Sequence, residues 1–165
     1  MSTTNIEFDS KKAQRFFKKL TKNVDRIGDR HKEYIDTISV FVIQDIERHF
    51  ETESGSENKR WPEWSDAYTK HMIKIGKGSN FKLQDSRHLH NSLKASNYRK
   101  VTNGIMWFNN AKTKTGEPYA AIHDQGLKNG DGVKMPRRRF MWLSKKALER
   151  INEATMEFAM RGLLR

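Results

Sequence analysis

The chain has 165 residues, about the length of one domain. It carries 32 Lys and Arg against 20 Asp and Glu, a formal net charge of +12, and it has no cysteine. The missing cysteines exclude a disulfide scaffold, a zinc ribbon, an iron–sulfur centre and a thiol enzyme. No apolar run approaches the roughly 18 residues that span a bilayer, and no apolar signal-peptide core follows Met1. We therefore expect a soluble protein of the cytoplasm with no membrane partner.

The composition indicates a folded domain with a small core. Hydrophobic residues make up 35% of the chain and charged residues 32%, against usual values of about 45–50% and 25%. The 9 Phe, 4 Trp and 4 Tyr argue against a disordered chain. Some elements are therefore expected to find their apolar cover on a partner subunit.

The positive charge is unevenly distributed when the chain is divided into three parts. Residues 1–60 hold 12 basic and 11 acidic side chains, residues 61–115 hold 10 and 3, and residues 116–165 hold 10 and 6. An excess of this kind favours an acidic partner, of which nucleic acid is the first candidate. A solvated basic surface, or a basic face against an acidic subunit, are the alternatives.

Two amphipathic helices are predicted at the start of the chain. The first runs from Lys11 to about Val24, with Asp9 or Ser10 as its cap, and the second from about Arg30 to Phe50. Apolar residues recur at three- and four-residue spacing in both, namely Phe16, Phe17, Leu20, Val24 and Ile27 in the first and Ile35, Ile38, Val42 and Ile46 in the second.

The middle of the chain alternates loops with short elements. Residues 51–60 contain no apolar side chain and predict an exposed loop. Ser65 or Asp66 is expected to cap a short helix, and Asp85-Ser86 a second one running to about Leu93. An Asn-Gly turn at 103–104 then predicts a β-hairpin over about 94–109, with Ile105 and Trp107 on one face and Met106 and Phe108 on the other.

The last third combines a short helix, a strand and a long helix. Residues 119–123 are expected to be helical, the three glycines of 126–132 predict a mobile loop, and residues 135–142 predict a strand. Ser144 is expected to cap a final helix. Its predicted packing residues are Ala147, Leu148, Ile151, Ala154, Met156 and Phe158.

The predicted fold is therefore α+β: N-terminal amphipathic helices, a small mainly antiparallel sheet made of the hairpin and the 135–142 strand, and a C-terminal helix. We expect a helical segment over 1–50 and an α+β unit over 51–165.

No motif for catalysis or cofactor binding is visible. His88 and His90 point to different sides of a helix, so they cannot easily share a metal. His123-Asp124 resembles half of an acid–base pair, but no catalytic serine or second carboxylate motif accompanies it. We expect no enzyme, no metal and no cofactor, and a hydrolase centred on His123 is the weakest alternative.

The densest basic run is Arg137-Arg138-Arg139. On a strand, Arg138 would point away from the other two, so three phosphate contacts from one face are not expected. The preferred interpretation is one structural arginine, paired with a carboxylate such as Asp124 or Glu117. Trp61 and Trp64 are expected to anchor a core or an interface rather than to stack on bases.

Four short blocks occur in an order that is more informative than any one of them. They are Trp61-Pro62-Glu63-Trp64, then Leu83-Gln84-Asp85-Ser86 with Leu89 and Ser92, then Tyr119-Ala120-Ala121-Ile122-His123-Asp124-Gln125-Gly126, and last Pro136-Arg137-Arg138-Arg139-Phe140-Met141 before the final helix. Over roughly residues 48–160 this order resembles that of tailed-phage virion morphogenesis proteins, also called tail completion proteins.

The resemblance implies a structural, non-enzymatic part of a phage particle. Such a protein completes the tail or joins it to the head at the neck, as a subunit of a ring, often of six copies. Its neighbours would be neck, connector or tail-tube proteins, and packaged DNA would be contacted without sequence specificity. The alternative function is a basic nucleic-acid-binding protein.

The resemblance also implies two groups of site residues. The first group, the motif residues, comprises Trp61, Trp64, Leu83, Asp85, Leu89, Tyr119, His123, Gly126, Pro136, Arg138 and Phe140. The second group would supply charge to a DNA channel and comprises Lys74, Lys77, Lys82, Arg137 and Arg139.

Three residues depart from the family pattern. Arg87 stands where a glycine is usual, which predicts a differently shaped turn at 86–88. Asp124 replaces the Gln that follows His, and Arg137 replaces a small residue after Pro. These two changes leave the hydrogen-bond pattern around them unassigned.

Overall fold

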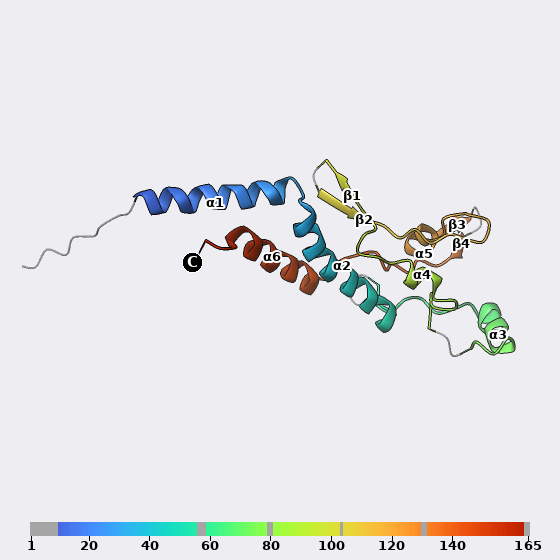
Figure 1. The fold of residues 1–165 in the computed structure, drawn as a ribbon. Coiled ribbons are helices and arrows are strands. Elements are labelled where there is room, and N and C mark those ends of the chain that lie inside the picture. The colour runs from blue at the N-terminus through green and yellow to red at the C-terminus, as the bar shows by residue number, and fades with distance from the viewer. Residues whose placement is uncertain (1–9, 56–58, 79–80, 103, 130–131, 164–165) are drawn as a thin grey trace, which may run out of the picture.

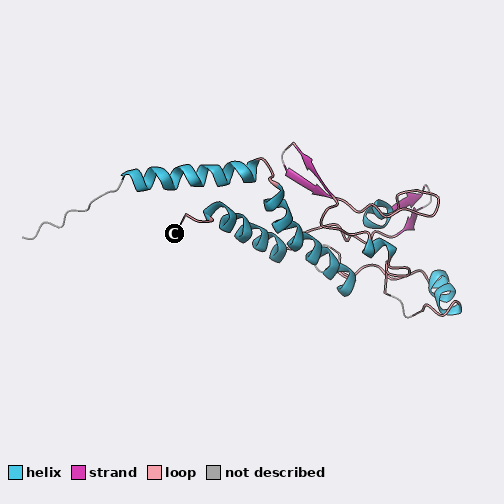
Figure 2. Ribbon diagram, in the orientation of Figure 1, coloured by secondary structure: helices cyan, strands magenta, loops and turns pink. Residues whose placement is uncertain are grey.

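The computed structural model describes residues 10–55, 59–78, 81–102, 104–129 and 132–163. The fold is mostly helical (Figure 2), with N-terminal helices, an antiparallel hairpin and a C-terminal helix that packs against the N-terminal ones. Its elements are α1 (Ser10–Gly28), α2 (Lys32–Thr52), α3 (Asp66–Lys74), α4 (His88–Asn91), β1 (Tyr98–Val101), β2 (Gly104–Trp107), α5 (Ala120–Gln125), β3 (Leu127–Asn129), β4 (Gly132–Met135) and α6 (Lys145–Met160).

The molecule is elongated, and α2 lies at its centre (Figure 1). At one end α6 packs against both α1 and α2. At the other end lie α3, α4, α5 and the β3–β4 pair. The predicted helices of the first 50 residues are thus present, although the Asp9 cap lies outside the described residues and Ser10 is the first residue of α1.

The core follows the apolar stripe of α2. The larger cluster surrounds Phe50 and Phe140, both with 0% exposure, and a smaller one surrounds Phe158. The larger cluster joins α2 to the region of the motif residues, and the smaller joins α2 to α6. Their buried members are Val42, Ile46, Phe50, Trp61, Leu89, Leu93, Ala111, Ala120 and Phe140 in the larger, and Tyr34, Ile38 and Phe158 in the smaller.

The predicted hairpin is confirmed as β1 paired antiparallel with β2, with Tyr98 opposite Trp107 and Val101 opposite Gly104. The predicted faces are also confirmed. Ile105 and Trp107 pack toward the smaller core cluster, whereas Met106 is exposed. The Trp107 indole N–H donates to the Ser39 hydroxyl at 3.1 Å, which fixes the hairpin to α2.

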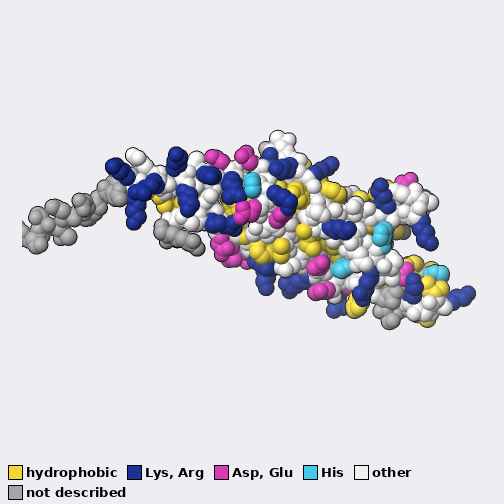
Figure 3. Space-filling model, in the orientation of Figure 1, with side chains coloured by type: hydrophobic (Ala, Val, Ile, Leu, Met, Phe, Trp, Pro, Cys, Tyr) yellow, Lys and Arg dark blue, Asp and Glu magenta, His cyan; other side chains and the backbone are white. Residues whose placement is uncertain are grey.

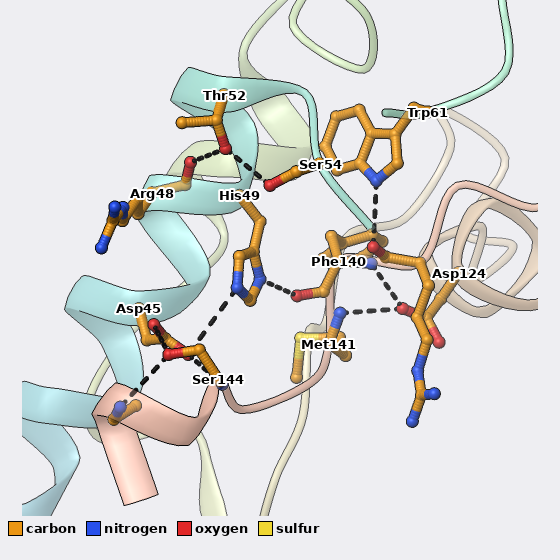
Figure 4. A network of polar contacts seen from close by, with 12 residues as sticks. Asp45, Arg48, His49, Thr52, Ser54, Trp61, Asp124, Phe140, Met141 and Ser144 are labelled. Atoms are coloured by element: carbon orange, nitrogen blue, oxygen red, sulfur yellow. Dashed lines mark hydrogen bonds and ion pairs between the residues drawn. The ribbon is translucent and has the colours of Figure 1, made fainter. Parts of the chain in front are cut away.

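The predicted strand at 135–142 is wrong, because β4 ends at Met135 and residues 136–143 form no ladder. The Asp124 side chain and the His123 carbonyl, both in α5, accept from N–H groups that a ladder would need. The Asp124 carboxylate accepts from the backbone N–H of Phe140 and Met141 at 2.9 and 2.8 Å, as Figure 4 shows. The His123 carbonyl accepts from the N–H of Arg138 at 2.9 Å.

The predicted glycine loop at 126–132 is instead the start of a second antiparallel pair, β3 with β4. Residues 130–131, between the two strands in the sequence, lie outside the described residues. Ser65 and Ser144 are confirmed as N-caps, since each hydroxyl accepts the N–H of the residue three positions on. The helix expected up to Leu93 is only the single turn of α4.

Several side chains expected to pack are exposed. On α6, Leu148 is 47% and Met156 64% exposed, and on α1 Phe17 is 62% and Val24 49% exposed. The apolar stripes of both helices are therefore wider than the surface that the monomer covers.

Candidate functional site

A cleft of about 790 Å³ opens between the residues before α3, the segment around α4, and the turn into residues 135–138. Its walls combine aromatic and aliphatic side chains with a few charged groups. The lining residues are Glu63, Trp64, Ser65, Tyr68, Phe81, Leu83, Asp85, Ser86, Leu89, Thr113, Tyr119, His123, Met135, Pro136 and Arg138.

This cleft gathers most of the motif residues. Although they are separated by up to 74 positions in the sequence, eight of the eleven line it: Trp64, Leu83, Asp85, Leu89, Tyr119, His123, Pro136 and Arg138. The remaining three lie behind the wall. Trp61 and Phe140 are buried against Phe50 in the larger core cluster.

Gly126 is the third residue behind the wall, and its position requires a glycine. Its φ is +78°, a conformation that L side chains rarely adopt. A Cβ there would lie 3.0 Å from the Met135 carbonyl oxygen and 3.0 Å from the Arg137 nitrogen. The chain can therefore turn from α5 into β3 against the segment that carries Arg138.

Arg138 connects two walls of the cleft. Its Nε donates to the Pro62 carbonyl and one terminal nitrogen to the Glu63 carbonyl, both at 3.0 Å. The predicted pairing of an arginine with the Asp124 or Glu117 carboxylate is wrong, since Asp124 is engaged by backbone N–H groups. Arg138 is 6% exposed and forms no ion pair with a described carboxylate. Burial lowers the pKa of Arg138 from its usual value.

His123 presents a neutral imidazole to the same cleft. Burial, and then repulsion from Arg138, lower the pKa of His123. Its Nδ1 is buried without a hydrogen-bond partner in the described structure. Its ring packs edge-on against Tyr119, with centroids 5.6 Å apart, and the Tyr119 hydroxyl contacts His88 Nδ1 at 2.9 Å. The cleft thus combines one buried nitrogen that has no partner in the described structure with apolar surface, a combination found in ligand sites.

Leu83, which lines the cleft, and Arg87, which directly precedes α4, have a left-handed backbone. Leu83 has φ 61° and Arg87 φ 53°, a conformation that costs a non-glycine residue energy. Arg87, at the position where the family pattern has a glycine, has the conformation that a glycine adopts without strain, and the differently shaped turn expected at 86–88 stays a prediction. Such strain tends to collect at functional sites.

Behind the cleft, side chains fix the 138–144 segment from both sides (Figure 4). The Trp61 indole N–H donates to the Arg139 carbonyl at 3.0 Å, and His49 Nδ1 donates to the Phe140 carbonyl at 3.0 Å. The Asp45 carboxylate accepts from the N–H and the hydroxyl of Ser144. The cleft wall is therefore attached to the central helix α2.

The cations proposed for a DNA channel differ in their pairing and exposure. Lys82 is 9% exposed and bonds to Glu53 at 2.8 Å and Glu63 at 3.1 Å, so it stabilises the fold. Lys77 forms an ion pair with Asp85 at 2.6 Å. Of the other three, Lys74 and Arg137 are exposed and Arg139 is half-buried.

The structure places the residues considered for metal binding and acid–base chemistry in other contacts. No group of three or more His, Cys, Asp or Glu side chains in the described residues is arranged to hold a metal ion. His88 and His90 diverge as predicted, because His88 contacts Tyr119 while His90 packs edge-on against Phe50. The Asp124 carboxylate is occupied by two backbone N–H groups.

Sequence reasoning missed two polar contacts that support the cleft. Glu53, in the segment expected to be an exposed loop, accepts from the backbone N–H of Lys82 at 2.5 Å as well as from its ammonium. Asn109 bonds to the Ser92 hydroxyl at 2.7 Å and to the Leu89 carbonyl at 2.9 Å. No local pattern indicates either pairing, since the partners are 17 to 29 positions apart.

Comparison with known proteins identifies the family. The family model described as "Phage virion morphogenesis family" matches residues 8–158, nearly the whole chain. No curated protein and no solved structure matches significantly. None of the described helices is long and apolar enough to cross a membrane. The matched family is a structural, morphogenetic family of phage tails and not a family of enzymes, and this chain belongs to the phage virion morphogenesis family.

Proposed function

We propose that this chain is a ring-forming structural subunit that completes the phage tail or joins it to the head at the neck. The partners would be further copies of itself, with six the expected number, and neighbouring neck, connector or tail-tube proteins. Its place would be the virion, after assembly in the host cytoplasm. The observation that carries the proposal is the gathering of eight motif residues in one cleft.

The chemistry of the cleft suits a protein segment better than a reacting substrate. Trp64 packs edge-on against Tyr68, which is 45% exposed, and together they offer aromatic surface. Beside them Arg138 has no paired carboxylate and His123 an unsatisfied nitrogen. A neighbouring subunit that inserts an apolar segment carrying an acidic or hydroxyl group would satisfy both.

Exposed apolar side chains support the same proposal. Phe17, Val24, Leu148 and Met156 are all at least 47% exposed. Surface of this kind, in a chain with a low apolar fraction, is typical of a subunit that completes its core on assembly.

The decisive experiment locates the chain in particles. Mass spectrometry of purified virions should detect it, and labelling should place it at the head-proximal end of the tail or at the neck. Native mass spectrometry of the full chain should give a closed ring of defined copy number. Absence from purified virions, or a monomer at all concentrations, would overturn the proposal.

A matched pair of variants tests the cleft itself. Trp64→Ser with Tyr68→Ser removes the aromatic surface, and Ile73→Ser with Ile75→Ser removes a similar exposed apolar area of the α3 region outside the cleft lining. In a phage that depends on this gene, the cleft variant should leave heads and tails unjoined while the control assembles. Normal assembly by a stably folded cleft variant would exclude the cleft as the docking site.

A further inference from the structure

Half of the excess positive charge lies on one helix. In its 19 residues α1 carries seven Lys and Arg and a single acidic residue, Asp25. Its net charge of +6 compares with +12 for the whole chain. The net charge of residues 1–60 as a whole hides the charge of α1. The reason is that α2 carries two Lys and Arg against five Asp and Glu, which offsets the positive charge of α1.

These cations form a continuous stripe, which comprises Lys11, Arg15, Lys18, Lys22 and Arg26. Their spacings of four, three, four and four residues place them on one face of the helix. The stripe extends over about 22 Å, at 1.5 Å per residue. All but the half-buried Arg26 are exposed, and Figure 3 shows Lys and Arg side chains gathered over α1.

Packing on α6 fixes which way the helix faces. Asn23, 8% exposed, donates to the carbonyls of Ala159 at 2.9 Å and Arg161 at 3.3 Å. On the same side of α1, Phe16, Leu20 and Ile27 are half-buried. The stripe therefore faces solvent, on a helix at one end of the molecule (Figure 1).

The stripe cations are largely uncompensated. Arg26 pairs with Glu33 at 2.6 Å. Lys18 and Lys22, by contrast, have no ion-pair partner in the described part of the chain. Adjacent like charges on a helix destabilise it, so an anionic partner would relieve this repulsion.

The geometry points to the α1 stripe, Lys11 to Arg26, as a site that binds the phosphate backbone of duplex DNA without reading sequence. A straight row of cations suits the regular phosphates of a duplex, where one charge occurs every ~1.7 Å of axis. An anionic membrane is the other large anionic surface. A membrane-bound helix turns its apolar face to lipid, and here α6 occupies the part of that face around Asn23, which leaves only Phe17 and Val24 strongly exposed on it.

The test measures binding of the full chain to a mixed-sequence duplex of about 30 base pairs by fluorescence anisotropy over a range of salt concentrations. The wild type should show a slope of log K against log salt of about −4 to −5, at ~0.9 per phosphate for five contacts. Lys11→Gln, Arg15→Gln, Lys18→Gln and Lys22→Gln together should weaken binding on the order of 10²–10³-fold at about 0.1 M salt. Glutamine keeps the helix propensity, and circular dichroism checks that α1 is retained.

The matched control removes the same charge elsewhere: Lys70→Gln, Lys94→Gln, Lys114→Gln and Lys146→Gln, all at exposed positions outside both α1 and the proposed channel group. It should weaken binding less than about threefold and leave the slope nearly unchanged. Equal losses in the two variants, or an unchanged slope in the stripe variant, would overturn the inference.

Two further measurements separate the alternatives. The double variant Phe17→Ser with Val24→Ser removes exposed apolar side chains of α1 and should leave DNA binding intact. Binding of the same variant to phosphatidylserine vesicles is measured in parallel. If the variant loses both DNA binding and vesicle binding, the helix is a membrane element and the inference fails. The inference does not depend on the ring. A ring that does not bind DNA would overturn the inference alone, and tight DNA binding by a chain that never assembles would overturn the proposed function alone.

Discussion

The two ends of this molecule differ in how much they depend on polar contacts. The α1–α2–α6 end is held by apolar side chains at helical spacing, such as Tyr34, Ile38 and Phe158. The cleft end shares the larger apolar cluster but has few regular elements, so side chains bonded to backbone groups, such as those of Asp124 and Arg138, also hold its segments in place. Loss of one apolar contact should therefore loosen the first end gradually, whereas loss of one polar contact should release a whole segment of the second.

The largest effect is expected where the two ends meet. Phe140 has 0% exposure and lies between Phe50 and the cleft wall, with a ring-centroid distance of 5.2 Å to Phe50. Phe140→Ala should lower the free energy of unfolding by about 3–5 kcal/mol, because it leaves a cavity. Leu148→Ala, at a site 47% exposed, should change it by less than about 0.5 kcal/mol. If urea denaturation gives equal losses of unfolding free energy for the two variants, then Leu148 of α6 is covered by another molecule in solution.

The second-largest effect is expected at Glu53, whose polar contacts support the cleft. Burial alone would raise the pKa of Glu53, but the hydrogen bonds from Lys82 lower it overall. Glu53→Gln leaves the buried Lys82 ammonium undercompensated and should cost about 2–3 kcal/mol near pH 7. Glu51→Gln, at an exposed position two residues earlier in the last turn of α2, is the control.

The pH dependence of the Glu53→Gln effect has a definite sign. Because the folded-state pKa of Glu53 is lowered, its contribution is present above its usual pKa of about 4.3 and is lost as the pH falls through the lowered value. The difference between wild type and variant should shrink over that range. A difference that persists in acid would contradict an ionic contribution.

Buried histidines give a smaller effect in a different pH window. Burial lowers the pKa of His49, 3% exposed and stacked on Trp142, more than Asp45 and the Phe140 carbonyl raise it. The unfolded chain then takes up the proton first, so stability is full above about pH 6.5 and declines as the pH falls. The slope should be at most about 1.4 kcal/mol per pH unit for each such histidine.

The measurement is the urea midpoint at a series of pH values from about 7 to 5. His123, whose pKa is also lowered, should contribute in the same direction. His123→Gln should reduce the slope and leave the part due to His49. Stability that rises as the pH falls through this range would contradict the prediction.

The smallest expected effect is a gain in folding stability. Arg87 has φ 53°, a left-handed conformation that glycine adopts without strain. Arg87→Gly should raise the free energy of unfolding by about 0.5–1 kcal/mol, since relief of strain exceeds the added flexibility of the unfolded chain. Thermal unfolding measures it, with Arg99→Gly in β1 as a control that should destabilise. A loss at Arg87 would mean that its side chain stabilises the cleft.

The sequence by itself determined the helices, their serine caps at 65 and 144 and the β1–β2 hairpin. Each depends on interactions between residues close in the chain: a 3.6-residue period, a hydroxyl three positions from its N–H, and an Asn-Gly turn. It also supplied the order of the motif blocks, and with it the family, because that order is a property of the chain alone.

Only the tertiary structure decided the form of the 136–143 segment and the gathering of the motif residues in one cleft. Whether the N–H groups of Phe140 and Met141 enter a ladder or bond to Asp124 depends on a partner 16 or 17 positions away. The direction in which the α1 cations face likewise depends on the docking of Asn23 against residues 159–161 of the chain. A local pattern carries no information about such distant pairings, so they become visible only in the folded structure.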